Sequence, residues 1–142
     1  MAVETRQKIA DIYKLKGDDK KYLAELKAIV SSDSKAGAER TDRTRFLAAK
    51  AALVLAEPLL KSYQDIKLVK PFKKNLNRKN KRMKQAIAAY TKLVDYEVGE
   101  VTAAATYHIA EIYLHFSRAL MNSERPDNLN ALELEQYELV IE

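Results

Sequence analysis

The sequence lacks cysteine and has few residues that break helices, with three glycines and three prolines in 142 residues. Without cysteine, disulfides, thiolate metal sites and a cysteine nucleophile are all excluded. Hydrophobic residues make up 47% and charged residues 32%, which is typical of long amphipathic helices rather than of turn-rich sheets. No stretch alternates in the manner of a strand between hairpin turns. We therefore predict an all-α fold, and the length fits one domain over residues 1–142.

Long hydrophobic runs are missing as well. The longest strongly apolar run, Ala51–Ala56, is far shorter than the roughly 18 residues that a membrane span needs. Nothing near Met1 resembles the hydrophobic region of a signal peptide. We expect a soluble chain without a transmembrane segment, and the sequence does not choose between the cytoplasm and a bacterial periplasm or cell envelope. It stops inside an apparent helix, at QYELVIE, so we also expect it to be part of a longer protein.

The motifs of common enzyme sites are absent too. The sequence contains no G-x-S-x-G string and no phosphate-cradling G-x-x-x-x-G-K loop. Its acidic residues are distributed as helix-surface partners of lysines. We predict no catalytic residue, no cofactor and no enzymatic activity.

What is present is a series of periodic apolar stretches, separated at Gly17, Gly37, Pro71, Gly99 and Pro126. They predict six or seven helices, at about residues 3–16, 19–31, 38–57, 58–69, 72–97, 100–122 and 130–142. Pro58 either kinks one long helix or opens a new one, and the lack of turn residues around it favours the kink. Asp18 is expected to cap the second helix, and Asn130 precedes Glu133 in the manner of a capping box.

One short string occurs twice. IADIY at Ile9–Tyr13 recurs as IAEIY at Ile109–Tyr113, an offset of 100 residues, which is close to three periods of about 34. Each copy places a large apolar residue beside an alanine, with an aromatic residue one turn further on. The alanine lets a partner helix approach closely, and the aromatic ring fills the space beside it. We expect Ala10 and Ala110 to lie where neighbouring helices nearly touch.

This pattern resembles the tetratricopeptide repeat family of helix-turn-helix units. The first copy follows the family pattern at Ile9, Ala10, Tyr13, Gly17 and Leu26, and departs from it at Tyr22 and Ser34. The string KQAIAAYTKLV fits a further second helix, with Ala86 at the small place and Tyr90 at the aromatic place. The next unit opens at Ile109, but its connection to the returning helix, ALELEQYELVIE, is longer than the family's short turn.

The resemblance covers residues 1–34 and 83–142, whereas residues 36–81 predict long helices without a repeat register. It implies a single helical-repeat domain of stacked antiparallel hairpins in a right-handed superhelix, belonging to a larger bacterial protein with degenerate repeats. Similar repeats serve as non-catalytic scaffolds for protein binding and assembly. An ordinary helical bundle that carries two coincident strings is the alternative.

Both histidines of the chain lie within Tyr107–Arg118. On a helix, His108, Glu111, His115 and Arg118 share one face, because they step by three, four and three residues. The two histidines are seven residues apart, about 10 Å along the axis, which is too far for both to bind an ion about 2 Å from each nitrogen. We predict no metal site. Two interpretations stay open, a solvated stripe with one Glu–His contact and one wall of a protein-binding groove.

The resemblance favours the groove, because the first helix of each tetratricopeptide unit lines the concave surface. By that register, the groove residues are Gln7, Asp11, Lys14, Tyr107, His108, Glu111, Leu114 and His115. We expect a protein or peptide partner, docked as a helix or as an extended segment. Self-association is a further option.

Charge is unevenly distributed along the chain. Residues 67–84 contain nine basic residues and no acidic one: Lys67, Lys70, Lys73, Lys74, Arg78, Lys79, Lys81, Arg82 and Lys84. Three interpretations compete: a solvated helix face, contact with an acidic protein, and binding of nucleic acid or anionic membrane. Nucleic acid is disfavoured, because the net charge is only +5 and Phe72 is almost the sole aromatic residue for base stacking. From Glu124 onward the balance reverses, with six acidic residues against Arg125 alone.

Overall fold

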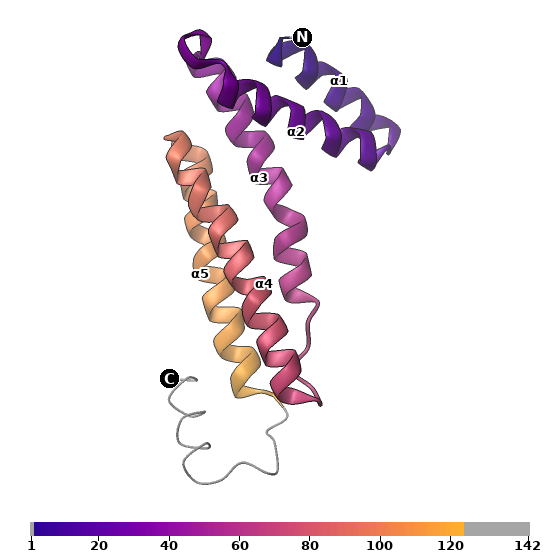
Figure 1. The fold of residues 1–142 in the computed structure, drawn as a ribbon, viewed down its shortest axis with the longest axis vertical. Helices are drawn as coiled ribbons and strands as arrows, with labels where there is room; N and C mark the ends of the chain where they lie inside the picture. The colour runs from indigo at the N-terminus through magenta and orange to yellow at the C-terminus, as the bar shows by residue number, and fades with distance from the viewer. Residues whose placement is uncertain (1, 124–142) are drawn as a thin grey trace.

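The computed structural model describes residues 2–123, and this part of the chain contains helices and no strand, which confirms the all-α prediction. The helices are α1 (Val3–Lys16), α2 (Asp19–Lys35), α3 (Asp42–Gln64), α4 (Phe72–Leu93) and α5 (Gly99–Met121), with short 3-10 turns η1 (Gly37–Glu39) and η2 (Val94–Tyr96). Figure 1 shows α3, α4 and α5 as a long bundle, with α1 and α2 across its upper end. The predicted helix 130–142 and its Asn130 cap lie outside the described residues. Within residues 2–123, no helix has the length and apolarity that a bilayer crossing requires.

Helices α1 and α2 form the predicted antiparallel hairpin. Gly17 ends α1 in the left-handed conformation, at φ 75°, where a side chain would be strained. Asp18 then caps α2, since its side chain accepts a hydrogen bond from the Lys21 amide at 3.2 Å. Ala10 is fully buried, and Leu26 and Ile29 of α2 belong to the same core cluster. The predicted hairpin of α1 and α2, with Ala10 in its core, is therefore present.

The start of α3 lies four residues later than predicted. Residues 37–39 form η1 instead of helix, and Thr41 begins α3 through a capping box with Thr44. Pro58 lies inside one continuous helix, as the single-helix interpretation required. Buried Asp33 at the end of α2 contacts Arg40 at 3.0 Å, and the Arg40 guanidinium lies 5.8 Å from the centre of the Tyr96 ring. This contact, which we did not predict, ties the hairpin to η2.

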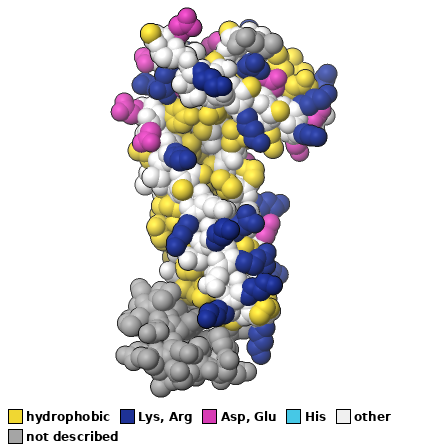
Figure 2. Space-filling model, viewed as in Figure 1, with side chains coloured by type: hydrophobic (Ala, Val, Ile, Leu, Met, Phe, Trp, Pro, Cys, Tyr) yellow, Lys and Arg dark blue, Asp and Glu magenta, His cyan; other side chains and the backbone are white. Residues whose placement is uncertain are grey.

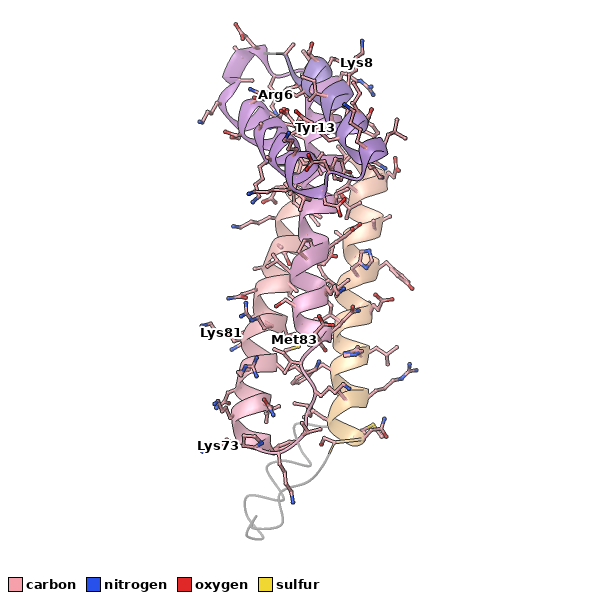
Figure 3. The ribbon with its side chains drawn as sticks, turned by 90° about the vertical axis from the view of Figure 1, so that its right-hand side faces the viewer. Arg6, Lys8, Tyr13, Lys73, Lys81 and Met83 are labelled. Carbon is pink, nitrogen blue, oxygen red and sulfur yellow. The ribbon has the colours of Figure 1, made fainter. Side chains whose placement is uncertain are left out.

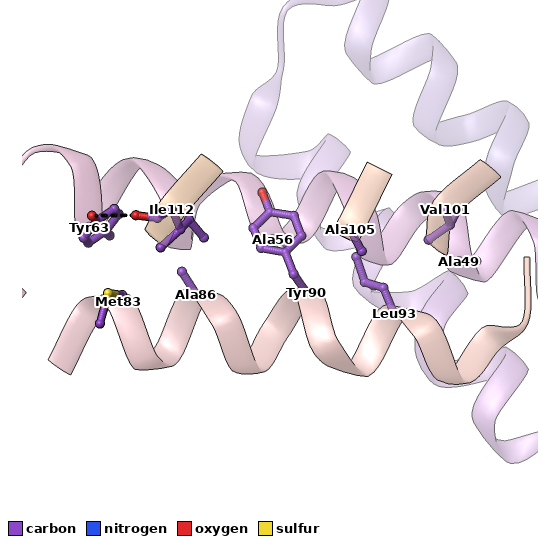
Figure 4. Packing of buried hydrophobic residues seen from close by; sticks show 10 residues of the cluster. All are labelled: Ala49, Ala56, Tyr63, Met83, Ala86, Tyr90, Leu93, Val101, Ala105 and Ile112. Carbon is purple, nitrogen blue, oxygen red and sulfur yellow. Dashed lines mark hydrogen bonds between the residues drawn. The ribbon is translucent and has the colours of Figure 1, made fainter. Parts of the chain in front are cut away.

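Small residues on three helices lie in the core of the long bundle (Figure 4). Ala56 of α3, Ala86 of α4 and Ala105 of α5 are all buried, which allows close approach of the three backbones. Tyr63 and Tyr90 fill the remaining space and are also fully buried. Ala86 and Tyr90 thus occupy core places, as expected from their sequence pattern.

The prediction for Ala110 is wrong in the described part of the chain. Ala10 is fully buried, but Ala110 is exposed, and Tyr113 is 54% exposed. The core face of α5 carries Ala105, Ile112 and Leu120 instead, and Ala110 points away from it. The second string, IAEIY, therefore does not mark a close contact between the described helices.

The predicted helix 58–69 is also wrong, because α3 ends at Gln64 and residues 66–71 are not helical. Lys79 of α4 provides hydrogen bonds to carbonyl groups at the end of α3. Its Nζ donates to the Tyr63 carbonyl at 3.0 Å and to the Ile66 carbonyl at 2.9 Å. The same Nζ lies 4.1 Å from the centre of the Tyr63 ring. A cation at a helix C-terminus also meets the negative end of the helix dipole. Burial lowers the pKa of Lys79 to about 8, and nearby Asp65 partly opposes this shift.

We expect Lys79→Met to lower the free energy of unfolding by about 1–3 kcal/mol, because two carbonyls lose their donor in a dry site. Urea denaturation of both proteins measures the difference. Lys81→Met is the matched control: it removes an exposed lysine from the same helix and should change stability by less than about 0.5 kcal/mol. Equal effects of the two substitutions would show that the buried contacts do not hold the end of α3.

Candidate functional site

A groove of about 490 Å³ runs along α5 beside the end of α3. Its lining consists of one α3 residue and six α5 residues: Gln64, Tyr107, Ala110, Glu111, Leu114, His115 and Arg118. The α5 residues step by three, one, three, one and three, so they form one face of the helix. Four of the five groove residues predicted on α5 therefore lie together: Tyr107, Glu111, Leu114 and His115.

The groove joins exposed apolar surface to a few polar groups. Tyr107 is 64% exposed and Leu114 is 52% exposed, and both line the same groove, so they form a continuous apolar surface rather than scattered single residues. Glu111 and Arg118 supply one charge of each sign on the same helix face. This combination suits a partner that presents an apolar stripe with polar groups beside it.

His115 forms the inner edge of the groove and is held by the core. Its Nδ1 lies 2.9 Å from the Tyr63 hydroxyl, which is also 3.2 Å from the Ile112 carbonyl. A phenol has one hydrogen, and a carbonyl only accepts, so both contacts are satisfied when Tyr63 donates to Ile112 and His115 Nδ1–H donates to the phenol. Nε2 is then an acceptor. Burial lowers the pKa of His115, the positive charge of Lys79 adds to the shift, and Glu111 opposes it.

His108 was predicted in the groove but lies outside its lining. Its ring packs against Tyr90, with 5.0 Å between the ring centres, and its Nδ1 is 3.5 Å from a Glu111 oxygen. The Nδ1 atom makes no hydrogen bond in the structure, so the Glu111 contact is an ion pair only when the imidazole is protonated. The two histidines thus have different partners. Among residues 2–123, no three side chains of metal-binding type are grouped to hold an ion.

The predicted groove residues of α1 lie elsewhere. Gln7 donates to Asp11 at 2.9 Å, and the Lys14 ammonium lies 5.7 Å from the centre of the Tyr22 ring, so all three form a local surface of the first hairpin. Helix α1 packs against α2 and α3, whereas the groove is on α5 near the lower end of the bundle in Figure 1. The prediction of one groove shared by both sets is wrong, because the first helices of the two repeat-like units do not lie side by side.

Eight of the nine basic residues in 67–84 are exposed. Figure 2 shows Lys and Arg side chains along one edge of the lower bundle, and Figure 3 shows Lys73 and Lys81 pointing away from it while Met83 points inward. Lys79 was predicted in the basic patch, and that assignment is wrong: its side chain is 1% exposed and donates to the Tyr63 carbonyl at the end of α3. Lys79 lies seven residues after Phe72, four before Met83 and seven before Ala86, and this helical spacing is the signal that could have placed it on the core face.

Three groove residues were not assigned to a groove from sequence. Gln64 belongs to α3, and its distance along the chain hides its place beside α5. Ala110 was expected between helices, and Arg118 was noted only as part of the polar stripe. The heptad-like spacing of apolar residues on α5 was the signal that could have located Ala110 on an exposed seam.

We expect His115 to make stability depend on pH. Its pKa in the folded protein is below the ordinary value of about 6.5, so below that pH the unfolded chain takes up a proton that the folded chain refuses. The free energy of unfolding should therefore fall as pH drops through about 6.5 toward the lower folded-state pKa. Urea denaturation at about pH 7.5 and pH 5 measures this change, which should be smaller in His115→Asn.

Leu114→Ala is the control, because it changes an exposed residue of the same helix that does not titrate and leaves the contact between Tyr63 and His115 in place, so it should keep the wild-type pH dependence. If His115→Asn loses as much stability on acidification as the wild type, another group is responsible.

No family model matches the chain, and comparisons with curated proteins and with solved structures gave no match. What the groove binds has to be argued from its own shape, charge and exposed side chains.

Proposed function

We propose that this protein is a non-catalytic scaffold that captures an amphipathic helix of a protein partner along α5. The observation that carries this proposal is a seam of mostly apolar residues with alternating spacings of four and three. We call it the α5 seam, and it consists of Ala103, Tyr107, Ala110, Leu114, Ser117 and Met121. Spacing of this kind places residues in line along a helix and is the pattern by which two helices pack side by side.

The exposure of the α5 seam supports a docking role. All five apolar members are exposed, including Met121 at 61%. The opposite face of α5 already packs in the core through Val101, Ile112 and Leu120. A helix with two apolar faces has one face available after its own bundle is complete. A partner helix with large apolar residues at matching intervals would remove this surface from water.

The polar groups beside the α5 seam would set the orientation of the partner. Glu111 and Arg118 lie two turns apart along the groove, with opposite charges. A partner helix with a basic residue near Glu111 and an acidic residue near Arg118 would be aligned in one direction, since the reverse arrangement places like charges together. Specificity would come mainly from these pairs, and affinity from the apolar contact.

The tetratricopeptide resemblance, with stacking into a right-handed superhelix, is part of this proposal. It is supported by the first hairpin, where Ala10 is buried against α2 and Gly17 makes the turn. The places of Ala86 and Tyr90 in the core are further support. The binding surface consists of α5 and the end of α3, and α1 has no part in it.

We test it by photo-crosslinking. A benzoylphenylalanine in place of Ala110, in the middle of the α5 seam, should crosslink a partner from cell extract, and the crosslinked peptide should carry an apolar three-four pattern. The same amino acid in place of Leu15 is the matched control, because Leu15 is 89% exposed on α1, far from the groove.

Tyr107→Ala with Leu114→Ala should then reduce binding of the identified partner about thirtyfold or more, since truncating central apolar anchors costs over about 1 kcal/mol each. Ile12→Ala with Leu15→Ala removes comparable exposed apolar surface from α1 and should leave binding unchanged. Equal losses in both variants, or crosslinks only at position 15, would contradict the assignment.

A further inference from the structure

A second, polar cleft of about 420 Å³ lies where α3 turns into α4. We call it the basic cleft. It is lined by the end of α3, by the connection and by one face of α4, through Ser62, Asp65, Ile66, Lys67, Val69, Asn75, Arg78 and Arg82. Three basic side chains and one acidic side chain therefore face the same space. The basic cleft is separate from the α5 groove, with which it shares no lining residue.

Two hydrogen bonds fix the shape of this cleft. Lys79 donates to the Ile66 carbonyl at 2.9 Å, and Asn75 Nδ2 donates to the Val69 carbonyl at 2.9 Å. Both ends of the segment that carries Lys67 are thus bonded to α4. A ligand would meet a cleft whose backbone is already ordered, which reduces the entropy lost on binding.

The arginines of the basic cleft have donors to spare. Arg78 Nη1 is 3.4 Å from Asn75 Oδ1, and Arg82 Nη1 is 3.5 Å from Gln85 Oε1, both long contacts to neutral groups. Within residues 2–123, neither arginine forms an ion pair, and neither does Lys67. Elsewhere the structure pairs Arg6, Arg40, Arg43, Arg45 and Lys50 with carboxylates.

The chemistry of the cleft points to carboxylates. A guanidinium presents a planar fork of donors that matches a carboxylate, and Arg78 and Arg82 are one helical turn apart. Asp65 is the one acidic residue of the lining, and its charge acts on buried Lys79, where it partly offsets the lowering of the pKa by burial. The net charge of the lining is +2, from three basic residues and one acidic residue.

The chain contains an acidic segment that starts next to this cleft. Residues 124–142 hold six acidic residues and one arginine, a net charge of −5. The described helix α5 ends beside the connection, because Leu120 packs with Leu68 and Phe72 in one cluster. Nine residues separate Ser123 from Glu133, and an extended chain of that length spans roughly 30 Å. Arg78 and Arg82 lie about 9 Å and about 15 Å along α4 from Phe72, at a rise of about 1.5 Å per residue, so the acidic residues are within reach of both.

We propose that the basic cleft is a binding site for a carboxylate-rich peptide, and that its occupant is the acidic segment 124–142 of this chain. Arg78 and Arg82 donate to glutamate side chains of the segment, and Lys67 adds charge at the rim. This site does not depend on the function proposed for the α5 groove. The contact is electrostatic, so it weakens with salt.

The experiment uses the full chain and the absence of cysteine. Gln136→Cys provides a single attachment point for a nitroxide in the acidic segment, and NMR then reports which backbone amides are broadened by it. We expect strong broadening of amides at Lys67, Arg78 and Arg82. It should fall about threefold or more between about 0.1 M and 1 M salt, where the screening length shortens from about 10 Å to 3 Å.

Charge reversal supplies the decisive comparison. Arg78→Glu with Arg82→Glu should abolish the broadening, and adding Glu133→Arg with Glu135→Arg in the same chain should restore it. Lys8→Glu with Lys16→Glu is the matched control: it changes the net charge equally at exposed lysines of α1 and should leave the broadening intact. If the reversed chain fails to fold, judged by its core amide signals, Arg78→Gln with Arg82→Gln replaces it, and the broadening should then be reduced.

Mixing isotope-labelled chains that lack the nitroxide with unlabelled chains that carry it tells whether the segment comes from the same molecule or a second copy. The cleft should not be broadened in this mixture, and broadening there as strong as in the singly labelled chain would contradict a contact within one molecule. Two results would overturn the proposal. The first is broadening centred on the α5 seam or unchanged by charge reversal at Arg78 and Arg82. The second is a cleft that the nitroxide does not reach, and signals that shift with a short DNA strand or with anionic vesicles would then identify the ligand as nucleic acid or membrane instead.

Discussion

The lower bundle depends on one buried cation. The Lys79 ammonium replaces the water that would otherwise satisfy the carbonyls of Tyr63 and Ile66, and it does so under the ring of Tyr63. Tyr63 in turn holds His115 at the edge of the groove, while Ile66 belongs to the floor of the basic cleft. Burying a charge is costly unless every donor finds an acceptor, so this contact permits few alternative geometries. Both candidate surfaces take their positions from it.

The sequence predicts the helices better than it predicts their contacts. Gly17 and Asp18 make the first turn where local chemistry requires it, and the buried alanine and tyrosine of α4 follow from apolar periodicity. The prediction of a helix at residues 58–69 failed for a different reason. Its apolar residues continue the helical period, but Leu68 is used in a cluster with Phe72 and Leu120 that forms only when the end of α5 returns to it. Such a tertiary contact has no local signal.

Part of the candidate groove, its α5 wall, could be predicted from the sequence. Residues at helical spacing on one segment, such as Tyr107, Glu111 and Leu114, were found because a helix brings them together by its own geometry. The second wall could not be found, since Gln64 carries no pattern that marks it as a neighbour of α5. The α1 residues were misplaced because repeat symmetry was assumed between two strings whose alanines have opposite environments, Ala10 buried and Ala110 exposed.

Helix α3 belongs to both large core clusters. Ala48 and Ala51 pack toward the first hairpin, whereas Ala49 and Ala56 pack toward α4 and α5. Methyl groups on both sides offer no rotamers that could absorb a change in spacing, so a bulkier residue on either side displaces the helix axis itself. Substitutions in the two clusters should consequently be epistatic although their side chains do not touch, and this single helix would constrain which pairs of core residues can evolve together.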